Sequence, residues 1–235
     1  MDNNRRFFIK SISLASFTLF LPAIFANKIK QYSKNVLIGK EKVKLYGKGY
    51  KMQKDAYLAL EKMKKEALVS GVRIHVISAY RSFEHQNRIW SRKFKKFRSK
   101  GLSVKEAVNK VKEYSAIPGT SRHHWGTDVD LVDYNKKFLN NNTKHSKYMA
   151  WMDENAHKYG FYRVYTNNKF RAGYNYESWH YSYRNISKAM LEDYLRLDIV
   201  AVLKNEKIAG NQVFTKKFLN KYFENNVLGI NDYLF

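Results

Sequence analysis

Two short motifs in separate parts of the chain constrain its fold more than any other feature of the sequence. Residues 121–130 are Ser-Arg-His-His-Trp-Gly-Thr-Asp-Val-Asp, and residues 177–180 are Glu-Ser-Trp-His. Together they supply imidazole and carboxylate groups of the kind that bind metal ions. A fold that uses both motifs must therefore bring two distant segments to one point.

The first motif offers two ligands and the second offers a third. His123 and Asp130 lie on either side of Gly126, which lets the backbone turn sharply between a loop and a predicted strand. His180 would come from a different strand. Two imidazoles and one carboxylate leave the fourth position of a tetrahedral ion open, and this set suits zinc better than magnesium or calcium. The sequence predicts one catalytic zinc ion.

Glu177 is the candidate general base, because zinc makes hydroxide available at neutral pH and a neighbouring group must carry the proton. It lies three residues before His180, and positions i and i+3 of a regular strand point to opposite faces. The interpretation therefore requires Glu177 to lie in a turn or bulge at the strand entrance.

A third segment, residues 78–86, lies where a predicted strand gives way to a helix. Arg81 in this segment could stabilise the oxyanion of a tetrahedral intermediate or bind the terminal carboxylate of a peptide. It could also cap the sheet through a salt bridge, and the segment alone does not decide among these roles.

Periodicity and capping signals predict an α+β fold, a small and mainly antiparallel sheet flanked by helices. Strands are expected at residues 72–78, 128–132, 161–165 and 174–183. Helices are expected at residues 55–70, capped by Asp55, at 82–97, at 103–114 with a capping box, at 147–159, at 186–204, capped by Asn185, and at 215–223.

The chain divides where its composition changes. Residues 1–26 resemble a twin-arginine export signal, with Arg5-Arg6 before an apolar run that is short for a membrane span. Cleavage after Ala26 and retention as an anchor both remain open. Residues 27–47 are expected to be a linker or arm, 48–204 the domain that holds the zinc site, and 205–235 a C-terminal helical extension.

The charge of the chain favours an anionic partner. Lys and Arg number 44 against 20 Asp and Glu, a formal net charge of +24, and cysteine is absent. Nucleic acid and an anionic cell envelope both fit such a charge. No nucleic-acid-binding motif is present, and export would remove that partner, so we expect the envelope or periplasm and no specific nucleic acid. We expect a monomer with no stable membrane span once the signal is removed.

The three segments together resemble the VanY-type D-alanyl-D-alanine carboxypeptidase and L,D-carboxypeptidase family, zinc peptidases related to lysostaphin and the hedgehog domain. The resemblance spans roughly residues 48–184. Its pattern is matched by Ser78, Tyr80, Arg81, Ser82, Gln86, Ser121, His123, Gly126, Asp130, Glu177, Trp179 and His180.

The resemblance implies zinc binding by His123, Asp130 and His180, with Glu177 as general base and then acid. Arg81 would polarise the scissile carbonyl of a D-amino-acid-containing stem peptide of peptidoglycan. Candidate substrate-binding residues are Ser121, Gln86, Tyr80, Trp179 and Asp128.

Asp128 departs from the family, which commonly has alanine at this position. It falls on the same strand face as Asp130. It could bind a substrate ammonium group, tune a ligand, or turn away and cap a loop, and we favour a role other than metal ligand.

We expect a zinc-dependent D,D-carboxypeptidase. An L,D-carboxypeptidase and a peptidoglycan endopeptidase remain alternatives within the enzyme class. A non-catalytic zinc-containing wall-binding module is the competing class, and the presence of Glu177 and Arg81 argues against it.

Overall fold

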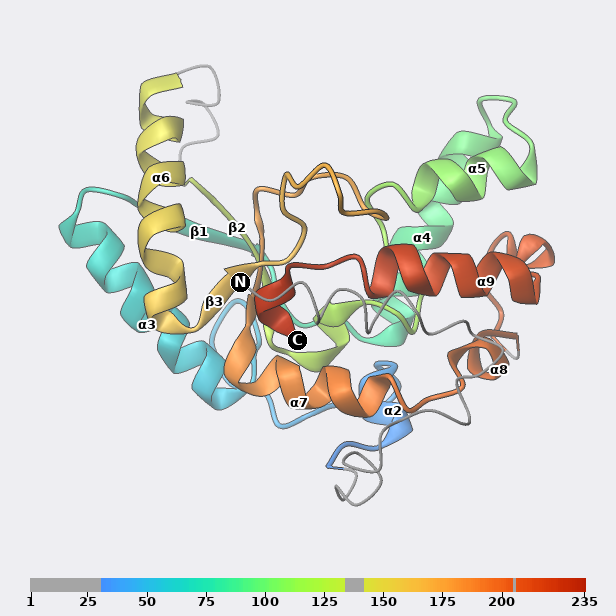
Figure 1. Ribbon diagram of the computed structural model, residues 1–235, viewed down its shortest axis with the longest axis horizontal. Coiled ribbons are helices and arrows are strands. Elements are labelled where there is room, and N and C mark those ends of the chain that lie inside the picture. Colours follow the sequence, from blue (N-terminus) through green and yellow to red (C-terminus); the bar gives the residue numbers. More distant parts are fainter. Residues whose placement is uncertain (1–30, 134–141, 205) are drawn as a thin grey trace. The chain divides into compact units, whose positions relative to one another are not determined.

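Among the described residues, four strands form one sheet in which all neighbouring strands are antiparallel (Figure 1). The computed structural model describes residues 31–133, 142–204 and 206–235, and Tyr32–Phe235 form one compact unit. The strands are β1 (Ile74–Ser78), β2 (Asp128–Asp133), β3 (Phe161–Arg163) and β4 (His180–Tyr183), in the order β1-β2-β4-β3. The predicted α+β class is confirmed.

Successive side chains of the two central strands, β2 and β4, point to opposite faces of the sheet, one apolar and one polar. Their apolar residues are buried in one core cluster: Val129, Leu131, Tyr181 and Tyr183. The residues between them point to the opposite face: Asp128, Asp130, His180 and Ser182. Strand register sets Asp130 opposite His180 and Asp128 opposite Ser182. The sheet thus presents a polar patch made from both motifs.

Helices α3 (Lys54–Val69) and α6 (Asn142–Asn155) contribute to the core on the apolar side of the sheet. The predicted inner face of α3 is confirmed, with four fully buried residues: Ala56, Leu60, Met63 and Ala67. The N-cap of this helix is Gln53, so the expectation that Asp55 caps it is wrong; Asp55 lies in the first turn. After α6, the 3-10 turn η5 (Ala156–Tyr159) ends at Gly160, as predicted.

A second apolar core joins the remaining helices around Trp90, which is fully buried. Ser82 caps α4 (Phe83–Arg98) by accepting from the His85 amide at 3.1 Å, and Ser103 with Glu106 forms the predicted capping box of α5 (Val104–Val111). The other helices of this core are α7 (Arg184–Tyr194), α8 (Ile199–Lys204) and α9 (Lys216–Tyr222).

Part of the segment expected to be a linker or arm contributes to this second core. Helix α2 (Lys34–Leu37) begins after Ser33, and Leu37 and Ile38 are buried. The Trp125 indole donates to the Leu37 carbonyl at 3.1 Å. So short an apolar run has too little periodicity to reveal its burial in the sequence.

Several expected elements are shorter or broken, and the reason is visible in the structure for two of them. The aromatic run 174–183 is a strand only over β4, because residues 178–179 form a turn. The expected helix 186–204 is two helices, since the Asp198 carboxylate accepts from the Ala201 amide and caps α8 separately. Tyr183, and not Asn185, occupies the N-cap position of α7.

The chain beyond α8 packs into the second core. Its remaining turns are η6 (Asn211–Val213), a π-helical turn (Phe223–Val227) and η8 (Asp232–Leu234). Phe223 and Leu234 are buried there. Within the described part of the chain, no helix is both long and apolar enough to cross a membrane. The predicted export signal lies outside that part.

Candidate metal centre

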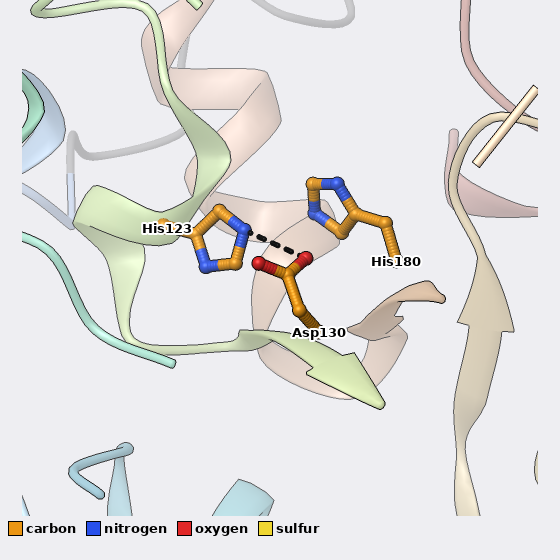
Figure 2. A group of neighbouring side chains, drawn as sticks. All are labelled: His123, Asp130 and His180. Atoms are coloured by element: carbon orange, nitrogen blue, oxygen red, sulfur yellow. Dashed lines mark ion pairs between the residues drawn. The ribbon is translucent and has the colours of Figure 1, made fainter. Parts of the chain in front are cut away.

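The three predicted ligands meet although they come from separate segments (Figure 2). His123 lies in the 3-10 turn η3 (Arg122–Trp125), Asp130 in β2, and His180 at the start of β4. One ligand atom from each residue lies within 4.8 Å of the other two, and all three residues are buried. The group therefore has the donor set and the spacing that a metal ion requires.

Gly126 allows the chain to pass directly from η3 into β2. It ends η3 in the left-handed conformation, with φ +68°. A Cβ atom at this position would lie 3.0 Å from the Leu45 side chain. The sharp turn predicted between the first two ligands is confirmed, and only glycine adopts it without strain.

Hydrogen bonding fixes the orientation of His123. Its Nδ1 lies 2.8 Å from the Ala79 carbonyl oxygen, which can only accept, so Nδ1 carries the proton. Its Nε2 faces the Asp130 carboxylate at 3.4 Å. Burial and the nearby Arg81 charge lower the pKa of His123, so the imidazole is neutral, as a metal ligand must be.

Arg81 holds Asp130 from the other side. Its guanidinium donates to Asp130 Oδ2 and, through Nε, to Ser78 Oγ at 2.8 Å. Burial raises the pKa of Asp130, but the contact with His123 and the nearby charges of His180 and Arg81 outweigh burial. They hold the pKa of Asp130 well below its usual range, so the carboxylate is ionised. The salt bridge that was one of the possible roles of Arg81 therefore exists, and it engages a candidate ligand.

Glu177 meets the geometric requirement that the sequence imposed on it. Ser178 and Trp179 form a turn before β4, and Glu177 Oε2 lies 3.1 Å from Nδ1 of His180. Burial lowers the pKa of His180, but hydrogen bonds with Asp128 and Glu177 outweigh it and raise that pKa to about 9. The metal-free ring is therefore protonated at neutral pH.

Asp128 does not lie where a substrate could reach it. Its side chain is fully buried, so the expectation of a substrate-binding role is wrong. Its carboxylate accepts from Arg122 Nε at 3.0 Å and lies 3.2 Å from Nε2 of His180. Burial raises the pKa of Asp128, but Arg122 and His180 outweigh it and keep the group ionised.

The other predicted substrate-binding residues occupy varied surroundings. Gln86 is 1% exposed; its amide accepts from Arg81 at 3.4 Å and donates to the Ala116 carbonyl at 2.9 Å. Gln86 therefore positions Arg81. Ser121 is buried at the start of η3. The Tyr80 hydroxyl is buried with no hydrogen-bond partner among the described residues.

Trp179 is half-buried beside the half-exposed Tyr114, with ring centroids 6.5 Å apart.

Sequence reasoning missed Arg122 as a partner of Asp128. The signal available was a carboxylate on a face expected to be buried, which needs a cation, and an arginine inside the same motif. The neighbouring His124 is not a ligand: Nδ1 donates to the Arg81 carbonyl at 2.7 Å and Nε2 accepts from the Gly119 amide at 3.1 Å. Burial lowers the pKa of His124 to about 4, so it joins two loops as a neutral ring.

Comparison with known proteins relates the chain to bacterial carboxypeptidases. D-alanyl-D-alanine carboxypeptidase of Enterococcus faecalis is 33% identical over 144 residues, covering 56% of this chain and 51% of the relative. The putative carboxypeptidase YodJ of Bacillus subtilis is 31% identical over 151 residues, covering 63% and 52%. The chain thus spans about half the length of these curated relatives.

Solved structures show the same fold. A zinc-bound mutant of the vancomycin-resistance D,D-pentapeptidase VanY is 28% identical, with a TM-score of 0.53, covering 65% of this chain and 85% of the other. VanYB in complex with D-alanine-D-alanine is also 28% identical, with a TM-score of 0.55, covering 72% and 92%. The sequence profile of the VanY family, described as D-alanyl-D-alanine carboxypeptidase, matches residues 49–186. This match covers more than half of the chain and includes both motifs, and the chain therefore belongs to the VanY D-alanyl-D-alanine carboxypeptidase family.

Proposed function

We propose that the protein is a zinc-dependent D,D-carboxypeptidase that removes the terminal D-alanine from stem peptides of peptidoglycan. The convergence of His123, Asp130 and His180 in one buried group, with Glu177 against the third ligand, carries the proposal. The related VanY structures, one bound to Zn(II) and one to D-alanine-D-alanine, support the choice of metal and substrate.

The donor set of the group fits zinc. Two imidazoles and one carboxylate are the ligands of many catalytic zinc sites, and the remaining position stays open for water or substrate. His123 is already neutral with Nε2 towards the group, and Asp130 is ionised. A bound zinc ion would supply the Lewis acidity that brings the pKa of water to about 7.

Glu177 is the residue best placed to move a proton. The other candidates are committed to structural contacts: His123 Nδ1 to the Ala79 carbonyl and Asp130 to Arg81. Glu177 is 5% exposed and contacts the ring of a ligand. It takes a proton from the attacking water and returns it to the leaving amine, so the peptide bond is cleaved without a free strong base.

Basic side chains beside the group suit a substrate that ends in a carboxylate. Arg81 polarises the scissile carbonyl, held in place by Ser78 and Gln86. Lys93 lies on the same face of α4 as Gln86, and its ammonium group donates to Ser115 at 2.5 Å. These two cations support a carboxypeptidase over an endopeptidase, because the substrate of an endopeptidase has no free carboxylate near the scissile bond.

We also propose that the protein is exported and acts in the periplasm or cell envelope. The paired Arg5-Arg6 before an apolar run supports export, and the formal net charge of +24 suits an anionic envelope. Fractionation of cells that make the full chain tests the location, and intact protein confined to the cytoplasm would contradict it.

A Glu177→Gln variant tests the reaction. On purified muropeptides with pentapeptide stems, mass spectrometry should show loss of one terminal alanine with the wild-type protein. The variant should be at least about 100-fold slower and still bind one zinc ion. The matched control is Glu224→Gln, at an exposed site, which should keep the wild-type rate. An undiminished rate in Glu177→Gln would overturn the mechanism, and loss of a two-residue fragment would indicate another bond preference.

A further inference from the structure

Lys93 is a cation near the candidate metal centre that has no carboxylate partner among the described residues. It is half-buried on helix α4, and its ammonium group donates to the Ser115 hydroxyl at 2.5 Å. Within the described part of the chain, this hydroxyl is the only group that contacts the ammonium. A lysine that loses water without gaining a counter-ion costs free energy. Such a group beside an active site is a candidate for binding an anion.

The fold places Lys93 on the inner face of α4. It follows Gln86 by seven residues, which is two helical turns, so the two side chains lie on one face of the helix. Both side chains contact the segment that leads to residues 121–130. Gln86 donates to the Ala116 carbonyl at 2.9 Å, and Lys93 donates to the neighbouring Ser115.

The charges of the candidate metal centre act on Lys93. Burial, first of all, and the like charges of Arg81 and Arg92 lower the pKa of Lys93. The opposite charges of Glu177 and Asp130 offset this lowering only in part. Lys93 therefore lies within electrostatic reach of the candidate general base and of a candidate ligand, although it contacts neither.

Arg81, the other cation beside the centre, is already occupied by the protein. Its three guanidinium nitrogens donate to Ser78, Gln86 and Asp130. The Asp130 carboxylate also neutralises its charge, so an anionic substrate group would have to compete with a candidate ligand for Arg81. Of these two cations, Lys93 is the one whose charge is not compensated within the described residues.

Ser115 adds a second donor at the same point. It is 5% exposed, and its oxygen accepts from Lys93, so its own hydrogen is available to donate. No other partner of this hydroxyl occurs among the described residues. The ammonium group has further N–H bonds to donate, and the hydroxyl has one O–H bond. This donor set fits a carboxylate, whose oxygens only accept.

We propose that Lys93 and Ser115 bind the C-terminal carboxylate of the peptide substrate, and that Lys93 makes cleavage depend on a free carboxylate beside the scissile bond. The proposal rests on the proposed function and assigns separate roles to the two cations. Arg81 acts on the scissile carbonyl, and Lys93 receives from the substrate the counter-ion that the described residues do not provide. Lys93 is thus a specificity-determining residue.

Two substrates that differ only at the C-terminus test this role: a stem peptide ending in D-alanine-D-alanine and the same peptide with a C-terminal amide. In kcat/KM the wild-type protein should prefer the acid about 10- to 100-fold, the contribution expected of a hydrogen bond to a charged group. Lys93→Met keeps the length of the side chain and removes the charge. It should lose the preference, chiefly through a higher KM for the acid. The matched control is Lys95→Met, at an exposed position of the same helix, which should keep the wild-type preference.

A preference for the acid that survives in Lys93→Met would overturn the inference, and so would a wild-type protein that cleaves both peptides equally well. Zinc-loaded wild-type protein that cleaves neither peptide would instead overturn the proposed function.

Thermal unfolding separates this role from a structural one. Lys93→Met removes an unpaired charge, so it should unfold at the wild-type temperature or above it. A Tm more than about 4 °C below that of the wild type would contradict the inference, because it would mean that Lys93 stabilises the free protein.

Discussion

The hydroxyl of Tyr222, the last residue of α9, is hydrogen-bonded to the loop that precedes residues 121–130. It lies 3.0 Å from the Ile117 amide, 2.8 Å from the Thr120 hydroxyl and 2.6 Å from the Tyr174 hydroxyl. Thr120 gives its own proton to the Ile117 carbonyl at 2.8 Å, so Tyr222 donates to Thr120 and accepts from the other two groups.

Tyr222→Phe keeps the ring in the core and removes this junction. The Ile117 amide and the Tyr174 hydroxyl then lose their acceptor in a buried place. Each unpaired buried donor costs about 1–3 kcal/mol, so we expect the two to lower the free energy of unfolding by about 2–6 kcal/mol. No cavity contributes beyond the volume of one oxygen atom.

Urea unfolding of the purified protein followed by circular dichroism measures this loss. The matched control is Tyr233→Phe, whose residue is 58% exposed and should change stability by less than about 0.5 kcal/mol. A loss below about 1 kcal/mol for Tyr222→Phe would refute the reasoning, because it would mean that the donors find other partners.

Three further predictions concern the site and the segments around it. Arg81→Lys keeps the charge but not the forked contacts, and should lower kcat about 100-fold in a peptide hydrolysis assay; an unchanged kcat would remove Arg81 from the reaction. Gly173→Ala should destabilise the protein by about 1–3 kcal/mol more than Gly49→Ala in thermal or urea unfolding. Both glycines have positive φ, but a Cβ atom at Gly173 would lie 1.9 Å from the Asn225 carbonyl oxygen, whereas one at Gly49 would meet nothing within 4 Å. Equal losses of unfolding free energy in the two variants would contradict this difference in packing. A metal must displace a proton from His180, whose pKa is raised to about 9, so apparent zinc affinity should rise about tenfold per pH unit from pH 6.5 towards 9; a flat profile in competition titrations would contradict this.

The sequence predicted those parts of the site that depend on the backbone conformation of one short segment. Gly126 between two ligands indicated a turn, and the sequence assigned Asp130 and His180 to two different strands, which the structure pairs. The requirement that Glu177 lie in a turn or bulge at the strand entrance followed from the alternation of strand side chains. It is met, because Glu177 begins a turn in which the His180 amide lies 3.5 Å from the Glu177 carbonyl oxygen.

Features that depend on contacts between distant segments could not be predicted in this way. The environment of Asp128 is completed by Ser182 from another strand, and a strand pattern does not specify its partner's register. Tyr222 lies in a predicted short helix, but periodicity does not say against which loop a helix packs. The break between α7 and α8 reflects a local competition, in which Asp198 begins a new helix more favourably than the first one continues.

Zinc titration of the metal-free protein, with D-alanine release from a stem peptide ending in D-alanine-D-alanine as the readout, tests the central claim most directly. We predict that the initial rate rises in proportion to added zinc and reaches its plateau at one ion per chain, and that His123→Ala abolishes the rise. D-alanine release that is independent of zinc, or saturated binding of zinc without any release of D-alanine, would contradict the account.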